Sequence, residues 1–238
     1  MTDEILLTLV AAFFAGALRG LTGFGSSLVL APVLAQLFDP GSAVALSLAT
    51  GVVATLFMMP RYGRTADRSF VAPMVLTGTI GLLPGMLLLH YVEAETMRGV
   101  IGSVTLLTAV GLLLAPHLVF PSGFWARLLA GAVGGGAMGA TSMGGPPIVL
   151  YLMGQKASPD VQKGNIVMTV GLIETVALAL LTALSLYPLS ALKLMLVIIG
   201  PFVIGAVVGR ELFARRGELF RPLALVLLAA TGLAALVL

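Results

Sequence analysis

The sequence predicts an all-α polytopic membrane protein made of two inverted-topology repeats, and three observations lead to this fold class. The chain of 238 residues is 59% hydrophobic and only 10% charged, with a mean hydropathy of +1.10, which lies outside the range of soluble domains. Long apolar runs recur along it, and about 20 such residues cross a bilayer as a helix. Glycine-rich breaks lie half a chain apart, at 23–25 and 142–145. The runs do not alternate in polarity, which excludes a transmembrane β-barrel.

The apolar runs, taken in order, define the expected helices. They cover 5–22, 26–38, 41–60, 70–92, 97–120, 125–142, 146–155, 161–184, 188–210 and 222–238. The first run follows Asp3 and Glu4, whereas a cleavable signal would open with positive charge, so we expect a retained helix. The third to fifth, the eighth and the last two runs have the length of membrane spans.

The second and seventh runs are each expected to be a half-helix that follows a break and turns the chain back. Run 146–155 is too short to span a bilayer at about 1.5 Å per residue. Pro146 suits a first helical turn, because the N–H that proline lacks has no partner there. Each repeat is therefore expected to contain a broken, re-entrant helix pair followed by three spans.

An internal duplication, which we place at 1–119 and 120–238, relates the two halves. An offset of 119 positions aligns identical residues. These pairs are Leu9 and Leu128, Ala11 and Ala130, Gly16 and Gly135, Gly20 and Gly139, Thr22 and Thr141, Gly25 and Gly144, Gln36 and Gln155, Pro40 and Pro159, and Thr50 and Thr169. At an offset of 124, Gly81 and Gly85 match Gly205 and Gly209. These glycine pairs predict close packing between the repeats, with a dimer interface as the alternative.

The basic residues predict the orientation, because Lys and Arg gather in cytoplasmic loops. Ten of the thirteen fall in four segments, 61–69, 116–127, 156–163 and 210–221. With these segments inside, loop 61–69 is cytoplasmic while its counterpart near 185–193 is outside. The two halves then point in opposite directions, and both termini are extracytoplasmic.

The breaks predict a binding site for a small anion. Irregular backbone at membrane depth is tolerated only where it is buried in protein or lines a cavity, and inverted repeats with discontinuous helices are typical of secondary transporters. Half-helix N-termini offer free N–H groups and a positive dipole end. The residues expected to hold the substrate at the breaks are Thr22, Gly23, Gly25, Ser26, Ser27, Thr141, Ser142, Gly144 and Gly145. The alternative is that these glycines only permit close helix packing.

Three further polar residues lie within predicted helices. Arg19 is an intramembrane cation beside the first break and is expected to contact the anion, with a structural ion pair or snorkelling as the alternatives. Glu174 is expected to carry protons or to be the counter-ion of Arg19; an inert glutamate facing the interface is the other reading. Asn165, four residues before Thr169 and on the same helix face, is expected to hydrogen-bond the substrate or to pack between helices.

The two breaks also carry a family resemblance. The segments "GALRGLTGFGSSLVLAPVL" (16–34) and "GGAMGATSMGGPPIVLYLM" (135–153) resemble the paired glycine-rich signature of the TauE/SafE family of sulfite-exporter-type permeases. The resemblance extends over nearly the whole chain and departs from the usual pattern at Ser26 and Ser27, where the family commonly keeps glycine. It implies export of small sulfur-containing anions, such as sulfite, thiosulfate or organosulfonates, across a prokaryotic cytoplasmic (inner) membrane.

Other classes of protein fit less well. The absence of cysteine excludes disulfides and thiolate chemistry, and no metal, cofactor or nucleic-acid partner is expected, since the pI near 9.6 comes from basic loops. A hydrolase built on Ser142 would need a general base in reach, and the two histidines stand at membrane edges, so we expect no enzyme. A passive anion channel remains the alternative to a transporter. Proton coupling and a homodimer are left open.

Overall fold

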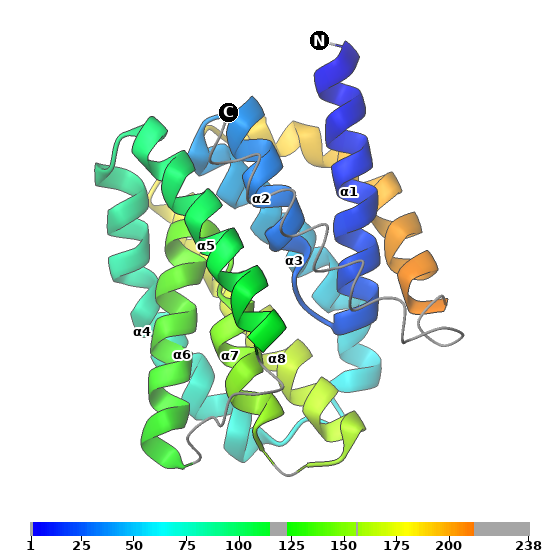
Figure 1. Ribbon diagram of the computed structural model, residues 1–238, viewed down its shortest axis with the longest axis vertical. Coiled ribbons are helices and arrows are strands. Elements are labelled where there is room, and N and C mark those ends of the chain that lie inside the picture. Colours follow the sequence, from blue (N-terminus) through cyan, green and yellow to red (C-terminus); the bar gives the residue numbers. More distant parts are fainter. Residues whose placement is uncertain (1, 115–122, 156, 212–238) are drawn as a thin grey trace.

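The computed structural model describes residues 2–114, 123–155 and 157–211, and within these ranges it contains helices and no strands (Figure 1). The helices are α1 (Thr2–Thr22), α2 (Ser26–Leu37), α3 (Pro40–Tyr62), α4 (Arg68–Tyr91), α5 (Ala94–Leu114), α6 (Phe124–Thr141), α7 (Gly145–Met153) and α8 (Pro159–Ala183). A 3₁₀ turn, η2 (Leu189–Leu194), then leads into a helix over 195–211. The predicted span 222–238 lies outside the described residues.

Five of the described helices are long and apolar enough to cross a membrane, and they identify an integral membrane protein. These are Glu4–Thr22, Pro40–Tyr62, Arg68–Tyr91, Asp160–Ala183 and Ala191–Glu211. Helix α2, with 12 residues, and helix α7, with 9, are shorter, as the sequence predicted. Helix α1 has 21 residues and thus a length of about 31 Å at 1.5 Å per residue, enough to cross the apolar core.

Helices α1 and α6 end in the same way. The residues that follow them, Gly23 and Ser142, take the left-handed conformation, with φ of 84° and 61°. Their N–H groups bond to the carbonyls of Arg19 and Met138, each at 2.8 Å. A left-handed residue at this position is the common stop for a helix, and glycine adopts it most readily. The sequence thus predicted both breaks to within one residue.

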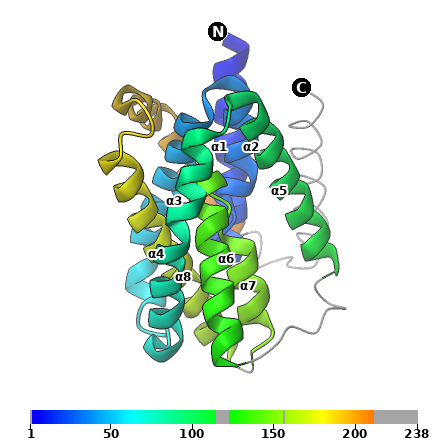
Figure 2. The same ribbon diagram turned by 90° about the vertical axis from the view of Figure 1, so that its left-hand side faces the viewer.

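The same offset of 119 relates several observed helix boundaries. The last residues of α1 and α6 are Thr22 and Thr141, and the first residues of α3 and α8 are Pro40 and Pro159. Corresponding helices run in opposite directions in Figure 1, where α1 and α3 descend while α6 and α8 ascend. The α3–α4 and α7–α8 turns lie at one end of the molecule, and the α4–α5 turn lies at the other (Figures 1 and 2).

Glycines bring α1 against helix 195–211, and α6 against α4. A Cβ on Gly16 or Gly20 would overlap the backbone of Phe202 or Ala206, respectively, and one on Gly135 or Gly139 would overlap that of Gly78 or Leu82. The late glycines complete both crossings, since Gly205 and Gly209 meet Phe13 and Ala17 while Gly81 and Gly85 meet Ala132 and Gly136. Each of these four glycine contacts in one crossing has its counterpart in the other at offsets of 119 and 124. The predicted packing within the chain is therefore confirmed.

Helices α3 and α8 cross at the centre of the molecule. A Cβ on Gly51 would lie 2.6 Å from Cδ of Glu174, and one on Gly171 would overlap Thr55. Only glycine leaves room for these neighbours, so the crossing admits a carboxylate and a hydroxyl between two buried helices. The crossing positions the polar cluster described next.

Candidate functional site

The two breaks are buried and in contact with each other. All residues from Gly23 to Ser27 and from Thr141 to Gly145 are buried. A Cβ on Gly145 would lie 2.8 Å from Cδ2 of Phe24, so the aromatic ring of the first break packs on the start of α7. A side chain at position 145 would push the breaks apart. Sequence analysis gave Phe24 no role although it lies within the predicted break at 23–25, because an apolar ring offers no donor to an anion.

Thr22 and Thr141 make matching backbone contacts at the ends of their helices. The Thr22 hydroxyl donates to the Leu18 carbonyl at 2.8 Å, and that of Thr141 donates to the Ala137 carbonyl at 2.7 Å. Each hydroxyl also accepts the N–H two residues ahead, from Phe24 at 3.2 Å and from Met143 at 3.3 Å. In this structure, both threonines shape the turns with hydroxyls that the sequence assigned to substrate.

The start of α2 has the features of an anion site. Gly25, with φ of 91°, precedes the first helical residue and provides no side-chain cap. Ser26 and Ser27 follow with exposed fractions of 0% and 4%. The Ser26 hydroxyl has no hydrogen-bond partner among the described residues. Buried hydroxyls are normally paired, so this one is available to a ligand beside the positive end of the helix.

The start of α7 offers fewer donors. Its N-cap Gly144 makes no side-chain bond, and Pro146 and Pro147 occupy the first turn. Since proline lacks an N–H, only the glycine N–H groups remain for a ligand. The Ser142 hydroxyl donates to the Thr141 carbonyl. The two breaks therefore differ in chemistry, and the donors concentrate at the first.

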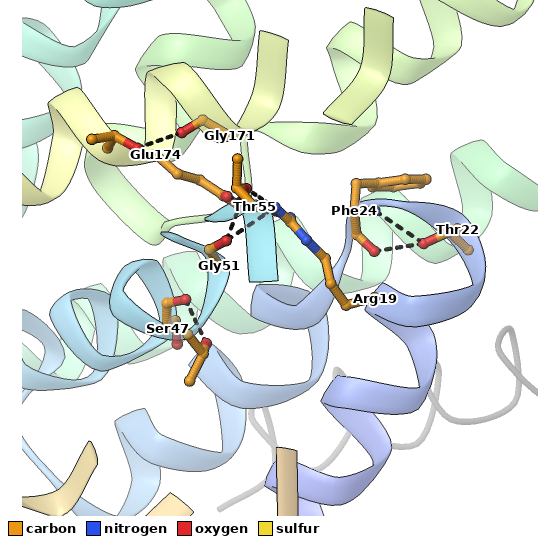
Figure 3. Close-up of polar contacts among 10 residues, drawn as sticks. Arg19, Thr22, Phe24, Ser47, Gly51, Thr55, Gly171 and Glu174 are labelled. Carbon is orange, nitrogen blue, oxygen red and sulfur yellow. Dashed lines mark hydrogen bonds and ion pairs between the residues drawn. The ribbon is translucent and has the colours of Figure 1, made fainter. Parts of the chain in front are cut away.

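Arg19 and Glu174 form a buried bidentate ion pair, shown in Figure 3. Nη1 donates to Oε1 at 2.9 Å, and Nη2 donates to Oε2 at 2.7 Å. Nη2 also reaches the Thr55 hydroxyl at 2.8 Å and the Gly51 carbonyl at 3.2 Å. The exposed fractions are 0% for Arg19 and 2% for Glu174. Of the roles that the sequence left open, the geometry favours Glu174 as the counter-ion of Arg19.

The guanidinium retains a free donor at Nε, which is buried without a hydrogen-bond partner in the described part of the chain. Sequence analysis missed Thr55, which completes the shell around Nη2. The internal repeat offered a signal for this residue, because Thr55 is the counterpart of Glu174 at the offset of 119.

Asn165 of α8 contacts the turn between α3 and α4. Its side-chain oxygen accepts the N–H of Asp67 at 2.7 Å. The residue lines a cavity of about 420 Å³ together with Gln155 and Gln162. The Asp67 contact occupies the side-chain oxygen, so a hydrogen bond from Asn165 to an anionic substrate would come from its side-chain NH2 group.

Lys163 approaches the first break from α8. Its Nζ donates to the Leu21 carbonyl at 3.4 Å and lies 5.1 Å from the centre of the Tyr62 ring. The stem of Lys163 reaches to 3.9 Å from where a Cβ of Gly23 would be. Sequence analysis noted this lysine only as part of a basic loop. The structure adds it as a second cation beside the break.

Comparison with known protein families identifies one match. The family model described as "Sulfite exporter TauE/SafE" matches residues 8–235. No curated protein and no solved structure gives a match. The matched region contains both breaks, the Arg19–Glu174 pair and both glycine crossings. The chain is therefore a membrane transport protein and belongs to the TauE/SafE sulfite exporter family.

Proposed function

We propose that this protein is a secondary transporter that exports small sulfur-containing anions, such as sulfite, thiosulfate or organosulfonates, and binds them between the two helix breaks. The observation that carries the proposal is the buried Ser26 hydroxyl at the start of α2, which has no hydrogen-bond partner among the residues that the structure describes and lies beside the contact between the breaks. Family membership supplies the substrate class.

The chemistry of the first break suits an oxyanion. The positive end of α2 and the Ser26 and Ser27 hydroxyls would surround the anion with donors. Lys163 adds a positive charge 3.4 Å from the Leu21 carbonyl. Because both breaks are buried, the desolvated site would strengthen these hydrogen bonds relative to water. The glycines of α7 would contribute N–H groups from the opposite side.

The repeats, 1–119 and 120–238, would provide alternating access. The shared helix boundaries, the opposite chain directions and the two equivalent glycine crossings support an inverted duplication. Two similar halves related by a pseudo-two-fold axis can exchange conformations, and the site between them then opens to one side at a time. Each crossing joins a helix of one repeat to a helix of the other. The repeats would therefore move against each other at these two crossings.

The Arg19–Glu174 pair would couple transport to protons. While Glu174 is ionised, its carboxylate holds two guanidinium nitrogens. Protonation would cancel that charge, weaken the pair and leave Arg19 free to attract the substrate. Binding of the anion and of a proton would then favour each other, as reciprocal linkage requires.

Flux measurements on the purified protein in liposomes test this function. Labelled sulfite, thiosulfate and an organosulfonate, with chloride and phosphate as controls, should show saturable exchange of the sulfur anions only. An imposed pH gradient should drive uphill accumulation, which Glu174→Gln should abolish while exchange persists. The proposed substrate class would be wrong if chloride or phosphate exchanged as well as the sulfur anions.

Electrical recording of the same liposomes distinguishes the passive channel. A channel would give currents far above transporter turnover and no uphill accumulation. The burial of both breaks favours the transporter, since a site enclosed by protein must rearrange for each ion that passes.

A further inference from the structure

The outer surface of α3, α4 and α8 contains a groove of about 840 Å³, separate from the helix breaks. Apolar side chains line most of it, among them Leu56, Leu76 and Leu172. Leu56 and Leu76 are 63% and 64% exposed. All three helices are candidate membrane spans, so this surface faces the hydrocarbon region of the bilayer.

One end of the groove is cationic. Arg64 and Arg68 line it at the α3–α4 turn, and both are exposed. Neither takes part in a salt bridge within residues 2–114, 123–155 and 157–211. The neighbouring Asp67 carboxylate accepts the N–H and the hydroxyl of Ser69, at 2.9 and 2.7 Å. No carboxylate of the described residues is thus paired with either arginine, and both lie where the candidate spans α3 and α4 end and begin, the expected level of the membrane surface.

We propose that this groove binds one anionic phospholipid, with its phosphate between Arg64 and Arg68 and an acyl chain along the apolar part of the groove. An apolar groove with a cationic end matches an anionic amphiphile, whereas a free phosphate would leave the apolar part of the groove empty. Basic pockets between transmembrane helices are the expected sites of anionic headgroups. The long arginine side chains can reach the headgroup level while their stems lie against apolar surface.

A lipid bound in this groove would stabilise the packing of the helices that line it. Met168 and Leu172 of α8 line its inner side, and Met168 Sδ lies 3.4 Å from where a Cβ of Gly63 would be. A lipid in the groove would bridge α4 to α3 and α8. It would thereby stabilise the helix that carries Glu174, whichever anion the protein transports.

Native mass spectrometry of the delipidated full chain tests the proposal. Phosphatidylglycerol and phosphatidylethanolamine with identical acyl chains are titrated separately. Wild type should bind one phosphatidylglycerol in preference to phosphatidylethanolamine. Arg64→Gln with Arg68→Gln should lose this preference by about fivefold per arginine, given the usual strength of an arginine near an anionic surface.

Two controls separate the site from general charge. Arg61→Gln with Arg210→Gln removes the same charge from exposed arginines that do not line the groove, and it should keep the preference. Ala72→Trp fills the groove without changing charge, and it should weaken binding of both lipids. Equal binding of the two lipids by wild type would overturn the proposal. The same holds if the preference survives in the Arg64 and Arg68 double variant or falls equally in the control.

Discussion

Arg19 of α1 and Glu174 of α8 are joined by two parallel hydrogen bonds of 2.9 and 2.7 Å, 155 positions apart in sequence and sealed from solvent. The pair joins α1, which ends at the first break, to α8, which follows the short helix α7 after the second break. Any movement of α1 relative to α8 must stretch or break this contact. It therefore connects the stability of the fold to the proposed transport cycle.

Breaking the pair from one side should destabilise the protein more than removing both partners. Glu174→Leu or Arg19→Met alone leaves an uncompensated buried charge, at a cost of about 3–5 kcal/mol. The double variant leaves none and should be more stable than either single variant. Thermal unfolding of wild type, both single variants and the double variant in detergent completes this double-mutant cycle. Additive losses in the double variant would mean that the two residues do not depend on each other.

Thr55→Val should weaken the cluster through Nη2 of Arg19. Valine preserves the shape of the side chain but removes the hydroxyl that accepts at 2.8 Å. Leaving a buried donor less satisfied costs about 1–3 kcal/mol. Thr55→Ser keeps the hydroxyl and is the matched control. If valine and serine at this position gave equal melting temperatures, the hydrogen bond would have no measurable role.

The two glycine crossings should respond alike to a larger side chain. Gly16→Val and Gly135→Val each place a side chain into the backbone of the partner helix, at Phe202 and Gly78 respectively. Overpacking of this kind costs about 1–3 kcal/mol. Gly99→Ala in α5 is the control, because a Cβ there meets nothing within 4 Å. Melting temperatures that fall for only one of the two valine variants would argue against equivalent crossings.

Asp67 should contribute to the acid sensitivity of the α3–α4 turn. Hydrogen bonds from the Ser69 side chain and backbone lower the pKa of this carboxyl group below its ordinary value of 3.8. A group with a lowered folded pKa stabilises the protein above pH 3.8 and loses that contribution as the pH falls through the folded value. In the Asp67→Asn variant, the melting temperature should therefore fall less steeply than in wild type as the pH is lowered from about 5 to about 3. An unchanged slope would contradict this role.

The sequence predicted the helix breaks well because glycine and proline act locally. Gly23 stops α1 by adopting φ of 84°, and Pro146 and Pro147 sit in the first turn of α7, both as their backbone chemistry requires. Such features depend on a few neighbouring residues, and the surrounding fold does not change them. The spacing of the late glycines predicted close packing but left a dimer interface open, and their contacts within the chain decide between the two.

The partners of polar side chains were harder to predict. Periodicity placed Asn165 and Thr169 on one helix face, but it could not say that the Asn165 amide would meet Asp67. Arg19 was expected beside the anion, and the structure pairs it with Glu174, a role the sequence had left open for the glutamate. Thr55 was missed because a threonine in an apolar helix is usually a packing residue, and Phe24, which lies within the first break, was missed because its packing partner Gly145 is distant in sequence.

The most direct test of the central claim, that an anion binds at the first break, is sulfite-dependent thermal stabilisation of Ser26→Ala. Because the Ser26 hydroxyl is buried and bonds to none of the described residues, its removal should leave the melting temperature without ligand unchanged. Ser47→Ala is the matched control, since its hydroxyl is also buried without a hydrogen-bond partner among the described residues but belongs to the body of α3 and not to the start of a helix. Sulfite should stabilise wild type and Ser47→Ala equally by mass action and Ser26→Ala much less. Equal stabilisation of both alanine variants, or none of wild type, would contradict binding at this break.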